Sequence, residues 1–176
     1  MKRTGFLGLG GNLGDRRARL QAAVDALPAA GVTPTQCSSV YATAAVGGPP
    51  GQPGFLNACV RIETGLAPEA LLDALKAIER VAGRPAEGQP DYVRHGPRPL
   101  DLDVLLLGGQ PHASERLTVP HPALARRRFV LVPLLELDLG LALPDGTSLA
   151  GALARLPVDE DVRRAGPPLR VTPAVR

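Results

Sequence analysis

The sequence is poor in aromatic residues and in cysteine. Only 3% of its 176 residues are aromatic, and it has no tryptophan and two cysteines. Base stacking on aromatic side chains is a main source of affinity for single-stranded nucleic acid, so this shortage counts against a nucleic-acid-binding protein. Cys37 and Cys59 have neither the CxxC spacing nor the companion histidines of a zinc site, and they do not make a disulfide framework. We therefore expect a protein of a reducing, intracellular compartment.

Long apolar runs are absent as well. The amino-terminal apolar stretch at residues 6–9 is short and broken by glycine, and nothing elsewhere approaches the roughly 18 residues of a membrane-spanning helix. The sequence predicts a cytoplasmic protein without a membrane partner. Its length suits one domain, because domains usually contain about 100–200 residues. We expect that domain over residues 1–165, followed by a Pro-rich, frayed tail over residues 166–176.

Lysine is scarce among the basic residues. The net charge is +3, and Lys2 and Lys76 are the only lysines among 20 basic residues. The planar guanidinium of arginine suits phosphate, but a genome rich in G and C produces the same excess without a functional reason. Position is more informative, because Arg84, Arg94 and Arg98 lie in or next to an irregular segment, where mobile cations can close over phosphate groups. The alternative is a loop of solvated arginines.

Apolar periodicity and turn residues predict alternating strands and helices. The predicted strands cover residues 6–9, 32–46, 57–63 and 100–107. One predicted helix follows Asp15 as its N-cap, and a second begins at Pro68. Two further helices are predicted over residues 128–137 and 149–156. Segments rich in Gly and Pro at residues 47–54 and 84–97 interrupt them. This βαββαβ order predicts an α+β fold, a ferredoxin-like sandwich with a mainly antiparallel sheet and extra carboxy-terminal helices. Such a fold does not decide the function.

Two aspartates interrupt the apolar strand predicted over residues 100–107. Side chains alternate along a strand, so Asp101 and Asp103 point to one face while Leu102 points to the other. Carboxylates this close repel each other, and their hard oxygens suit Mg²⁺, whose other positions go to water and phosphate. Two Mg²⁺ ions can share the pair. The alternative is a polar strand face exposed to water, although aspartate is depleted in strands of this kind.

The glycine run at residues 10–14 does not match a nucleotide-binding motif. It lacks the Gly-Lys-Ser/Thr ending of a P-loop, and Leu13 stands where the dinucleotide fingerprint needs glycine. A tight turn is the simpler interpretation, with Asn12 in a position to aim its amide at a ligand. Ser38, Ser39 and the cysteines have no adjacent histidine, which argues against covalent catalysis.

Short motifs follow one another in a recognisable order. They are Gly-Gly-Asn-Leu-Gly at residues 10–14, Ser-Val-Tyr-Ala-Thr at 39–43, Phe-Leu-Asn at 55–57, Gly-Pro-Arg-Pro-Leu-Asp-Leu-Asp at 96–103 and Leu-Thr-Val-Pro-His at 117–121. In this order they resemble the 6-hydroxymethyl-7,8-dihydropterin pyrophosphokinase family over most of the chain. The segment at 96–103, together with the later Thr-Val-Pro-His, is the specific part of the resemblance.

The resemblance implies a folate-pathway enzyme that transfers the diphosphoryl group of ATP to the hydroxymethyl oxygen of a pterin and leaves AMP. It implies that two Mg²⁺ ions bind the carboxylates, and that the catalytic residues are Arg84, Arg94, Asp101 and Asp103. The residues that match the family's ATP site are Leu72, Arg84, Arg98, Val104, Arg116, Thr118, His121 and Arg127. Those that match its pterin site are Asn12, Thr43, Ala44, Val46, Phe55, Asn57 and Phe129, with the two phenylalanines on either side of the ring. We expect a monomer or a weak homodimer.

Several positions depart from the family pattern. Phe55 stands where tyrosine is common, Ala44 replaces a common proline, His95 replaces a tryptophan, and Lys76 stands where glutamine is frequent. The loop that carries Arg84 is also longer than in the enterobacterial pattern. Two other functions stay open on the sequence: a related nucleotide transferase with a different acceptor, and a non-catalytic ferredoxin-like module that binds RNA or a small effector.

Overall fold

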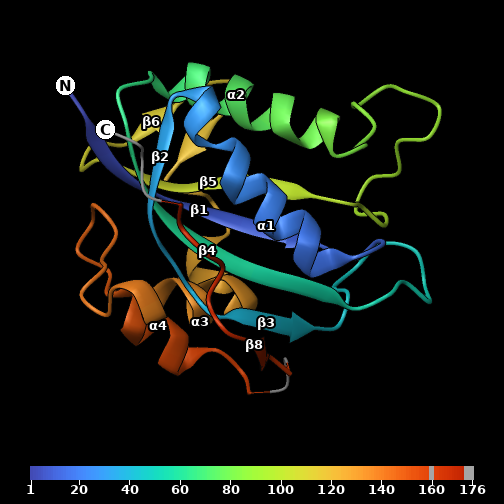
Figure 1. Cartoon of the computed structure of the whole chain (residues 1–176). Coiled ribbons are helices and arrows are strands. Elements are labelled where there is room, and N and C mark those ends of the chain that lie inside the picture. The colour runs from blue at the N-terminus through green and yellow to red at the C-terminus, as the bar shows by residue number, and fades with distance from the viewer. Residues whose placement is uncertain (159–160, 173–176) are drawn as a thin grey trace.

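The computed structural model describes residues 1–158 and 161–172, and in it a six-stranded sheet lies between two layers of helices (Figure 1). The long elements are β1 (Arg3–Gly11), α1 (Arg16–Ala26), β2 (Val32–Cys37), β3 (Val40–Thr43), β4 (Phe55–Thr64), α2 (Pro68–Val81), β5 (Asp101–Leu107), α3 (Arg128–Leu137) and α4 (Leu149–Arg155). The short elements are β6 (His112–Ala113), β7 (Thr118–Val119), β8 (Arg163–Gly166) and the 3₁₀ turns η1 (Pro28–Ala30) and η2 (Leu124–Arg126). The predicted α+β, ferredoxin-like fold with extra carboxy-terminal helices is confirmed.

Strand β1 lies inside the sheet and fixes its order. The order is β5-β1-β4-β3-β8, and β2 pairs with the half of β4 that β3 leaves free. Each of these pairings is antiparallel. The register sets Asp101 and Asn57 on either side of Gly10, and it sets Asp103 opposite Gly8. Because directly opposed residues share a face, both aspartates and Asn57 lie on the same side of the sheet.

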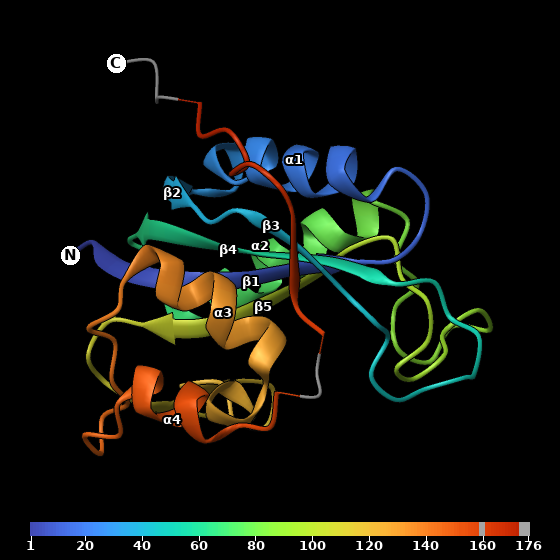
Figure 2. The same ribbon diagram turned by 90° about the horizontal axis from the view of Figure 1, so that it is seen from below.

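Different helices cover the two faces of the sheet (Figure 2). α1 and α2 pack on one face, where Leu75 joins the same buried cluster as Leu7. α3 and α4 pack on the other face, where Leu131 and Leu149 lie in one cluster with Phe6. Successive strand residues point to opposite faces, so Phe6 and Leu7 anchor the two layers in turn. Burying each of these large side chains contributes about 1.5–3 kcal/mol to folding.

Local signals set the helix ends. Asp15 caps α1 as predicted, because its side chain accepts a hydrogen bond from the backbone N–H of Ala18 at 3.0 Å. Pro68 opens α2 at a position where a missing N–H costs no intrahelical bond. The third predicted helix has the predicted bounds in spite of Pro133.

The extended segment predicted over residues 32–46 is divided into two strands. The division falls at Ser38, whose backbone N–H donates to the carbonyl of Cys59 at 2.9 Å. The Oγ of Ser38 accepts from the N–H of Cys59 and donates to the carbonyl of Ser39, both at 2.8 Å. The hydroxyl thus replaces a strand contact with its own bonds, and β2 and β3 pair with different halves of β4.

The carboxy-terminal segment is packed rather than frayed as far as Val171. β8 pairs with β3, Leu169 is buried in the α1 and α2 layer, and Arg17 donates to the carbonyl of Pro167 at 3.1 Å. Neither β8 nor this packing was predicted, and residues 173–176 of the predicted tail lie outside the described residues. The division into a domain at 1–165 and a tail stays a prediction. In the described part of the chain, no helix is long and apolar enough to cross a membrane.

Candidate active site

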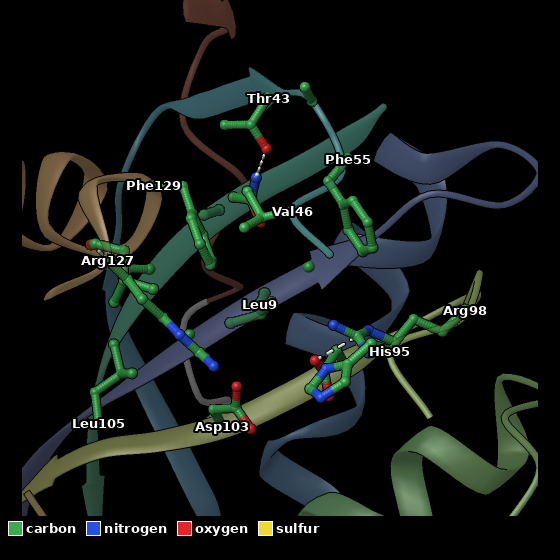
Figure 3. Close-up of a pocket in the computed structure, with 18 of the residues that line it drawn as sticks. Leu9, Thr43, Val46, Phe55, His95, Arg98, Asp103, Leu105, Arg127 and Phe129 are labelled. Atoms are coloured by element: carbon green, nitrogen blue, oxygen red, sulfur yellow. Dashed lines mark hydrogen bonds and ion pairs between the residues drawn. The ribbon is translucent and has the colours of Figure 1, made fainter. Parts of the chain in front are cut away.

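A cavity opens on the α3 face of the sheet, where β1 contributes glycines instead of side chains (Figure 3). Its volume is about 220 Å³. A Cβ atom at Gly10 would lie 3.1 Å from Oδ1 of Asn57, and one at Gly8 would lie 3.4 Å from Leu105, so larger residues would fill the floor. The structure brings together in its lining these residues predicted from the sequence: Thr43, Ala44, Val46, Phe55, Asn57, Arg98, Asp101, Asp103, Arg127 and Phe129.

Two phenylalanines from different elements project into the cavity (Figure 3). Phe55 begins β4, and Phe129 lies in the first turn of α3. Two residues after Phe55 and on the same face, Asn57 is buried, and its Nδ2 donates to Oγ1 of Thr43 at 2.8 Å. The cavity therefore offers aromatic faces and a fixed polar edge, a combination that suits a planar heterocycle.

The two aspartates point to the same face of β5, as predicted, but their environments differ. Asp101 accepts a hydrogen bond from Arg84 and pairs with Nε of Arg98 at 3.1 Å. Burial acts to raise the pKa of Asp101, but Arg98 and Arg84 outweigh it and hold the pKa below its usual value. Burial, with repulsion from Asp101, raises the pKa of Asp103 to about 6. One carboxylate is thus compensated by arginine, whereas the other is costly to ionise until a cation approaches.

The donor set of this pair suits Mg²⁺. No cluster of three or more His, Cys, Asp or Glu residues that fits a metal occurs within residues 1–158 and 161–172. Asp101 and Asp103 therefore leave most positions of an ion to water and phosphate, which is the usual arrangement for magnesium bound with a nucleotide. Zinc sites are built largely from His and Cys, so this pair does not fit zinc.

Two arginines lie between the aromatic walls and the carboxylates. The guanidinium of Arg98 is 5.3 Å from the centroid of the Phe55 ring, and that of Arg127 is 5.8 Å from the Phe129 ring. Both distances are within the range of cation–π attraction. Planar guanidinium groups bind phosphate oxygens well, so the positive charge is suitably placed for a phosphate chain next to an aromatic ligand.

His121 and Thr118 lie beside β5 rather than in the cavity lining. The backbone N–H of His121 donates to the carbonyl of Leu105 at 2.9 Å. Its Nδ1 accepts from the N–H of Ala123 at 3.1 Å, and burial, followed by the charge of Arg127, lowers its pKa. The imidazole is therefore neutral, with its proton on Nε2.

Five further residues of the predicted catalytic and nucleotide sets also lie outside the lining. Arg116 pairs with Asp73, and Arg84 reaches the site from beside it, through Asp101. Leu72 and Val104 pack in the apolar cluster between α2 and the sheet, so the side chain of Val104 is not available to a ligand on the cavity side. Arg94 is on the exposed surface of the loop at residues 84–97.

Asn12 contacts other protein groups instead of a ligand. It is 2% exposed, its Nδ2 donates to the carbonyl of Pro53 at 3.1 Å, and its Oδ1 accepts from the N–H of Arg98 at 2.8 Å. Both ends of the amide are occupied. In this structure Asn12 thus links the glycine turn to the two neighbouring loops, and its predicted contact with the pterin stays a prediction.

Sequence reasoning missed several residues at or behind the site, and three of them are informative. Leu105 lines the cavity, and the alternation that placed Asp101 and Asp103 on one face would have found it. His95 lines the cavity from a left-handed backbone conformation, with φ of 55°, which no pattern in the sequence predicts. Glu79 is buried in α2 and contacts Arg84; its signal was a charge within an apolar helical stripe.

A family profile and two bacterial proteins similar to this chain are described as pyrophosphokinases of a hydroxymethyldihydropterin. A family profile described as 7,8-dihydro-6-hydroxymethylpterin-pyrophosphokinase matches residues 6–139. The Pseudomonas aeruginosa protein named 2-amino-4-hydroxy-6-hydroxymethyldihydropteridine pyrophosphokinase is 42% identical over 161 residues, which cover 92% of this chain and 96% of that protein. A protein of the same name from Bacillus subtilis is 44% identical over 138 residues, which cover 78% of this chain and 79% of that protein.

Longer proteins contain a similar region. The mitochondrial folate synthesis bifunctional protein of Arabidopsis thaliana is 43% identical over 141 residues, which cover 80% of this chain and 24% of that protein. A crystal structure of Plasmodium falciparum HPPK-DHPS with STZ-DHP matches with a TM-score of 0.68 and 12% identity, over 88% of this chain and 43% of that one. This chain thus spans less than half of both proteins, and the structural likeness shows the fold alone.

Proposed function

The chain belongs to the 7,8-dihydro-6-hydroxymethylpterin-pyrophosphokinase family, and we propose that the cavity between Phe55, Phe129 and the two aspartates is its active site. The protein is an ATP-dependent diphosphotransferase of folate biosynthesis, which transfers the diphosphoryl group of ATP to the hydroxymethyl group of 6-hydroxymethyl-7,8-dihydropterin and forms AMP. The observation that carries the site proposal is that aromatic walls and a carboxylate pair share one cavity.

The pterin ring is proposed to stack between Phe55 and Phe129. Asn57 and Thr43 support this placement, because their hydrogen bond fixes a polar edge beside the aromatic faces. The backbone over residues 43–46 completes the pocket. A ring held there has its hydroxymethyl group directed toward the charged end of the cavity, where the arginines and aspartates lie.

Asp101 and Asp103 are the residues proposed to hold Mg²⁺, and the family resemblance implies two ions. Bound Mg²⁺ would neutralise negative charge on the phosphates of ATP and orient them. Arg98 and Arg127 supply further positive charge from the cavity wall, and Arg84 supplies it from behind Asp101. His121 is neutral and donates through Nε2, which suits a hydrogen bond to a phosphate oxygen.

Transfer of this kind depends mainly on positioning and charge neutralisation, so a protein nucleophile is not required. Cys59 is the thiol in the cavity lining, and burial raises its pKa well above the usual value. A thiol in that state is a poor nucleophile. The chemistry therefore fits direct attack of the hydroxymethyl oxygen on the β-phosphorus of ATP, with AMP as the leaving group.

Asp101→Asn and Asp103→Asn test the site. Each substitution keeps the shape but removes a charged ligand, and each should lower Mg²⁺-dependent AMP formation from ATP and hydroxymethyldihydropterin by about 1,000-fold, as expected when several kcal/mol of charge stabilisation is lost. Asp25→Asn is a matched control, because Asp25 is exposed on α1 and bonds to Gln21. Wild-type rates in either active-site variant would refute the proposal.

The cellular location and assembly belong to the proposal as well. We expect the enzyme in the cytoplasm, as a monomer or a weak homodimer that acts on two small molecules and binds neither nucleic acid nor membrane. Size-exclusion chromatography with light scattering, with and without Mg²⁺ and ATP, measures the assembly state directly.

A further inference from the structure

A buried carboxylate on α2 lies behind the aspartate pair. Glu79 is 2% exposed, and charged side chains are rarely buried to this extent unless they are paired. It continues the apolar stripe of α2, one turn after Leu75 and two turns after Leu71. An apolar residue would serve packing better at this position. The reason for a carboxylate must therefore lie in what it contacts.

The contacts of Glu79 are with two cations and one peptide group. Its Oε1 accepts from the backbone N–H of Leu102 at 2.7 Å and from Nη1 of Arg84 at 2.8 Å. Nζ of Lys76 donates to Oε1 at 3.0 Å and to Oε2 at 2.9 Å. Bonds to an ionised group are stronger than neutral ones, and this set compensates the cost of burying the charge.

The hydrogen bond to Leu102 holds the backbone between the two proposed metal ligands. Leu102 separates Asp101 from Asp103, and β5 is an edge strand whose sheet partner is β1. On the other edge of β5, Glu79 receives the Leu102 N–H in place of a neighbouring strand. Because both aspartates are covalent neighbours of Leu102, this bond restrains the backbone that carries them.

Arg84 connects Glu79 to Asp101 directly. Its Nη1 donates to both carboxylates, so one nitrogen bridges α2 and β5. An oxygen of Asp101 that binds a metal ion no longer serves the arginine equally well. Glu79 is a second anionic partner of the same nitrogen, and it lies outside the proposed pair of metal ligands.

We propose that Glu79 is a positioning residue for magnesium–ATP binding, which fixes the β5 backbone between Asp101 and Asp103 and retains Arg84 beside them. The inference rests on the proposed function of the cavity. Amide exchange and binding of a nucleotide analogue, the two measurements that test the role of Glu79, do not depend on transfer to a pterin. Failure of the proposal for Glu79 is therefore distinguishable from failure of the proposed function.

Glu79→Gln is the first test, because it keeps the side-chain size, removes the charge and presents an amide to groups that need an acceptor. In the metal-free protein, the Leu102 amide should exchange with deuterium roughly 10-fold faster, since it loses a charge-assisted bond. Calorimetric affinity for α,β-methylene-ATP with Mg²⁺ should fall by about 10- to 100-fold, the usual effect of losing a support of metal ligands. Without Mg²⁺ the affinity should change by less than about threefold.

Glu136→Gln is the matched control. Glu136 also accepts from a backbone amide, the N–H of Ser39 between β2 and β3, at 3.0 Å, and from the hydroxyl of Tyr41 at 2.9 Å. It has no contact with Asp101, Asp103 or Arg84 among the bonds of the described residues. This variant should leave Leu102 exchange and Mg²⁺-dependent affinity unchanged. If Glu79→Gln does not fold, Glu79→Asp, which keeps the charge but withdraws it by one methylene, replaces it in both measurements.

A double-mutant cycle separates the two roles of Glu79. If Glu79 acts partly through Arg84, Glu79→Gln should lower Mg²⁺-dependent affinity less in an Arg84→Ala background than in the wild type. Equal losses in both backgrounds would remove the role toward Arg84. Unchanged Leu102 exchange together with wild-type Mg²⁺-dependent affinity in folded Glu79→Gln would overturn the proposal as a whole.

Discussion

Asp103 carries an ionisation cost that its neighbour Asp101 avoids. Arginines compensate Asp101, whereas burial and the charge of Asp101 raise the pKa of Asp103 to about 6. A raised carboxyl pKa means that the folded state holds the proton more tightly than the unfolded state. The stability that Asp103 contributes to the metal-free protein is therefore lost as the pH rises from about 4 through 6, and this loss is complete above that range.

Asp103→Asn should stabilise the metal-free protein at pH 7.5, even though we expect it to lower the activity of the enzyme. The amide removes the buried anion, so we expect a gain on the order of 1 kcal/mol, or about 2–4 °C in Tm. Most of the gain should disappear near pH 4, where the aspartate is protonated in the folded state and about half protonated in the unfolded state. Thermal unfolding in EDTA at the two pH values measures it. A lower Tm for the variant at pH 7.5 would contradict the assigned cost.

The aromatic pair is expected to carry much of the affinity for the pterin. Phe129→Leu removes one ring but leaves an apolar side chain, so pterin affinity in the presence of Mg²⁺ and an ATP analogue should fall roughly 10- to 100-fold. Phe6→Leu is the control, because Phe6 is buried on the same face of the sheet outside the cavity lining. Equal affinities for both variants would show that the ring does not stack on Phe129.

At the residue scale, the sequence predicted the residues that line the cavity better than the residues that hold them in place. Strand alternation placed Asp101 and Asp103 on one face, and the structure confirms it. Glu79 was missed because its role depends on how α2 crosses the edge of β5, which no local pattern contains. The link that Asn12 makes between two loops was not predicted, because a polar residue in a turn does not reveal which loops will approach it.

At the scale of elements, two irregular loops contact each other across the mouth of the site. Nε2 of Gln52 donates to the carbonyl of His95 at 3.0 Å, and Asn12 bonds to both flanks of this contact. Gly48, with φ of 75°, approaches so closely that a Cβ atom there would lie 2.2 Å from the same carbonyl oxygen. The loop over residues 47–54, beside the proposed pterin pocket, thus packs against the loop over residues 84–97 and is hydrogen-bonded to it.

This contact predicts that nucleotide binding slows hydrogen exchange over residues 84–97, and that Gln52→Ala weakens the effect. Loss of one neutral hydrogen bond costs about 1 kcal/mol, so exchange near His95 should be about fivefold faster in the variant. Gln110→Ala is a suitable control, because Gln110 is exposed away from both loops. Exchange that is the same with and without α,β-methylene-ATP would contradict the expected closure.

The predicted helices and strands were accurate where one local pattern extended over the whole segment. They were wrong where contacts with another strand set the bounds of the element. The apolar periodicity and Pro68 were sufficient for α2, and Asp15 was sufficient for the start of α1. β2 and β3 were predicted as one strand, because their separation depends on the bonds of Ser38 to β4. β8 exists through its pairing with β3, and its four residues have no apolar pattern of their own.

At the scale of the whole molecule, the carboxy-terminal segment joins parts that are distant in sequence. After β8 extends the sheet beside β3, the chain passes over α1, where Gln21 accepts from the N–H of Arg170 at 2.8 Å. Leu169, one residue before Arg170, is buried in the cluster beneath α1. Because β3 also carries Thr43 of the cavity, the segment supports a wall of the site without contacting the ligand.

Leu169→Ala should therefore destabilise the protein while leaving its chemistry intact. Leu169 is 3% exposed, and truncating a buried leucine costs about 2–3 kcal/mol where neighbours can partly relax, so the Tm should fall by roughly 5–10 °C. Leu139→Ala controls for the change of residue type, because Leu139 is 75% exposed and should shift the Tm by less than about 2 °C. AMP formation at 20 °C should be the same in both variants. If the two variants unfold at the same temperature, the carboxy-terminal segment does not unfold with the rest of the molecule, and the support it gives to β3 is dispensable.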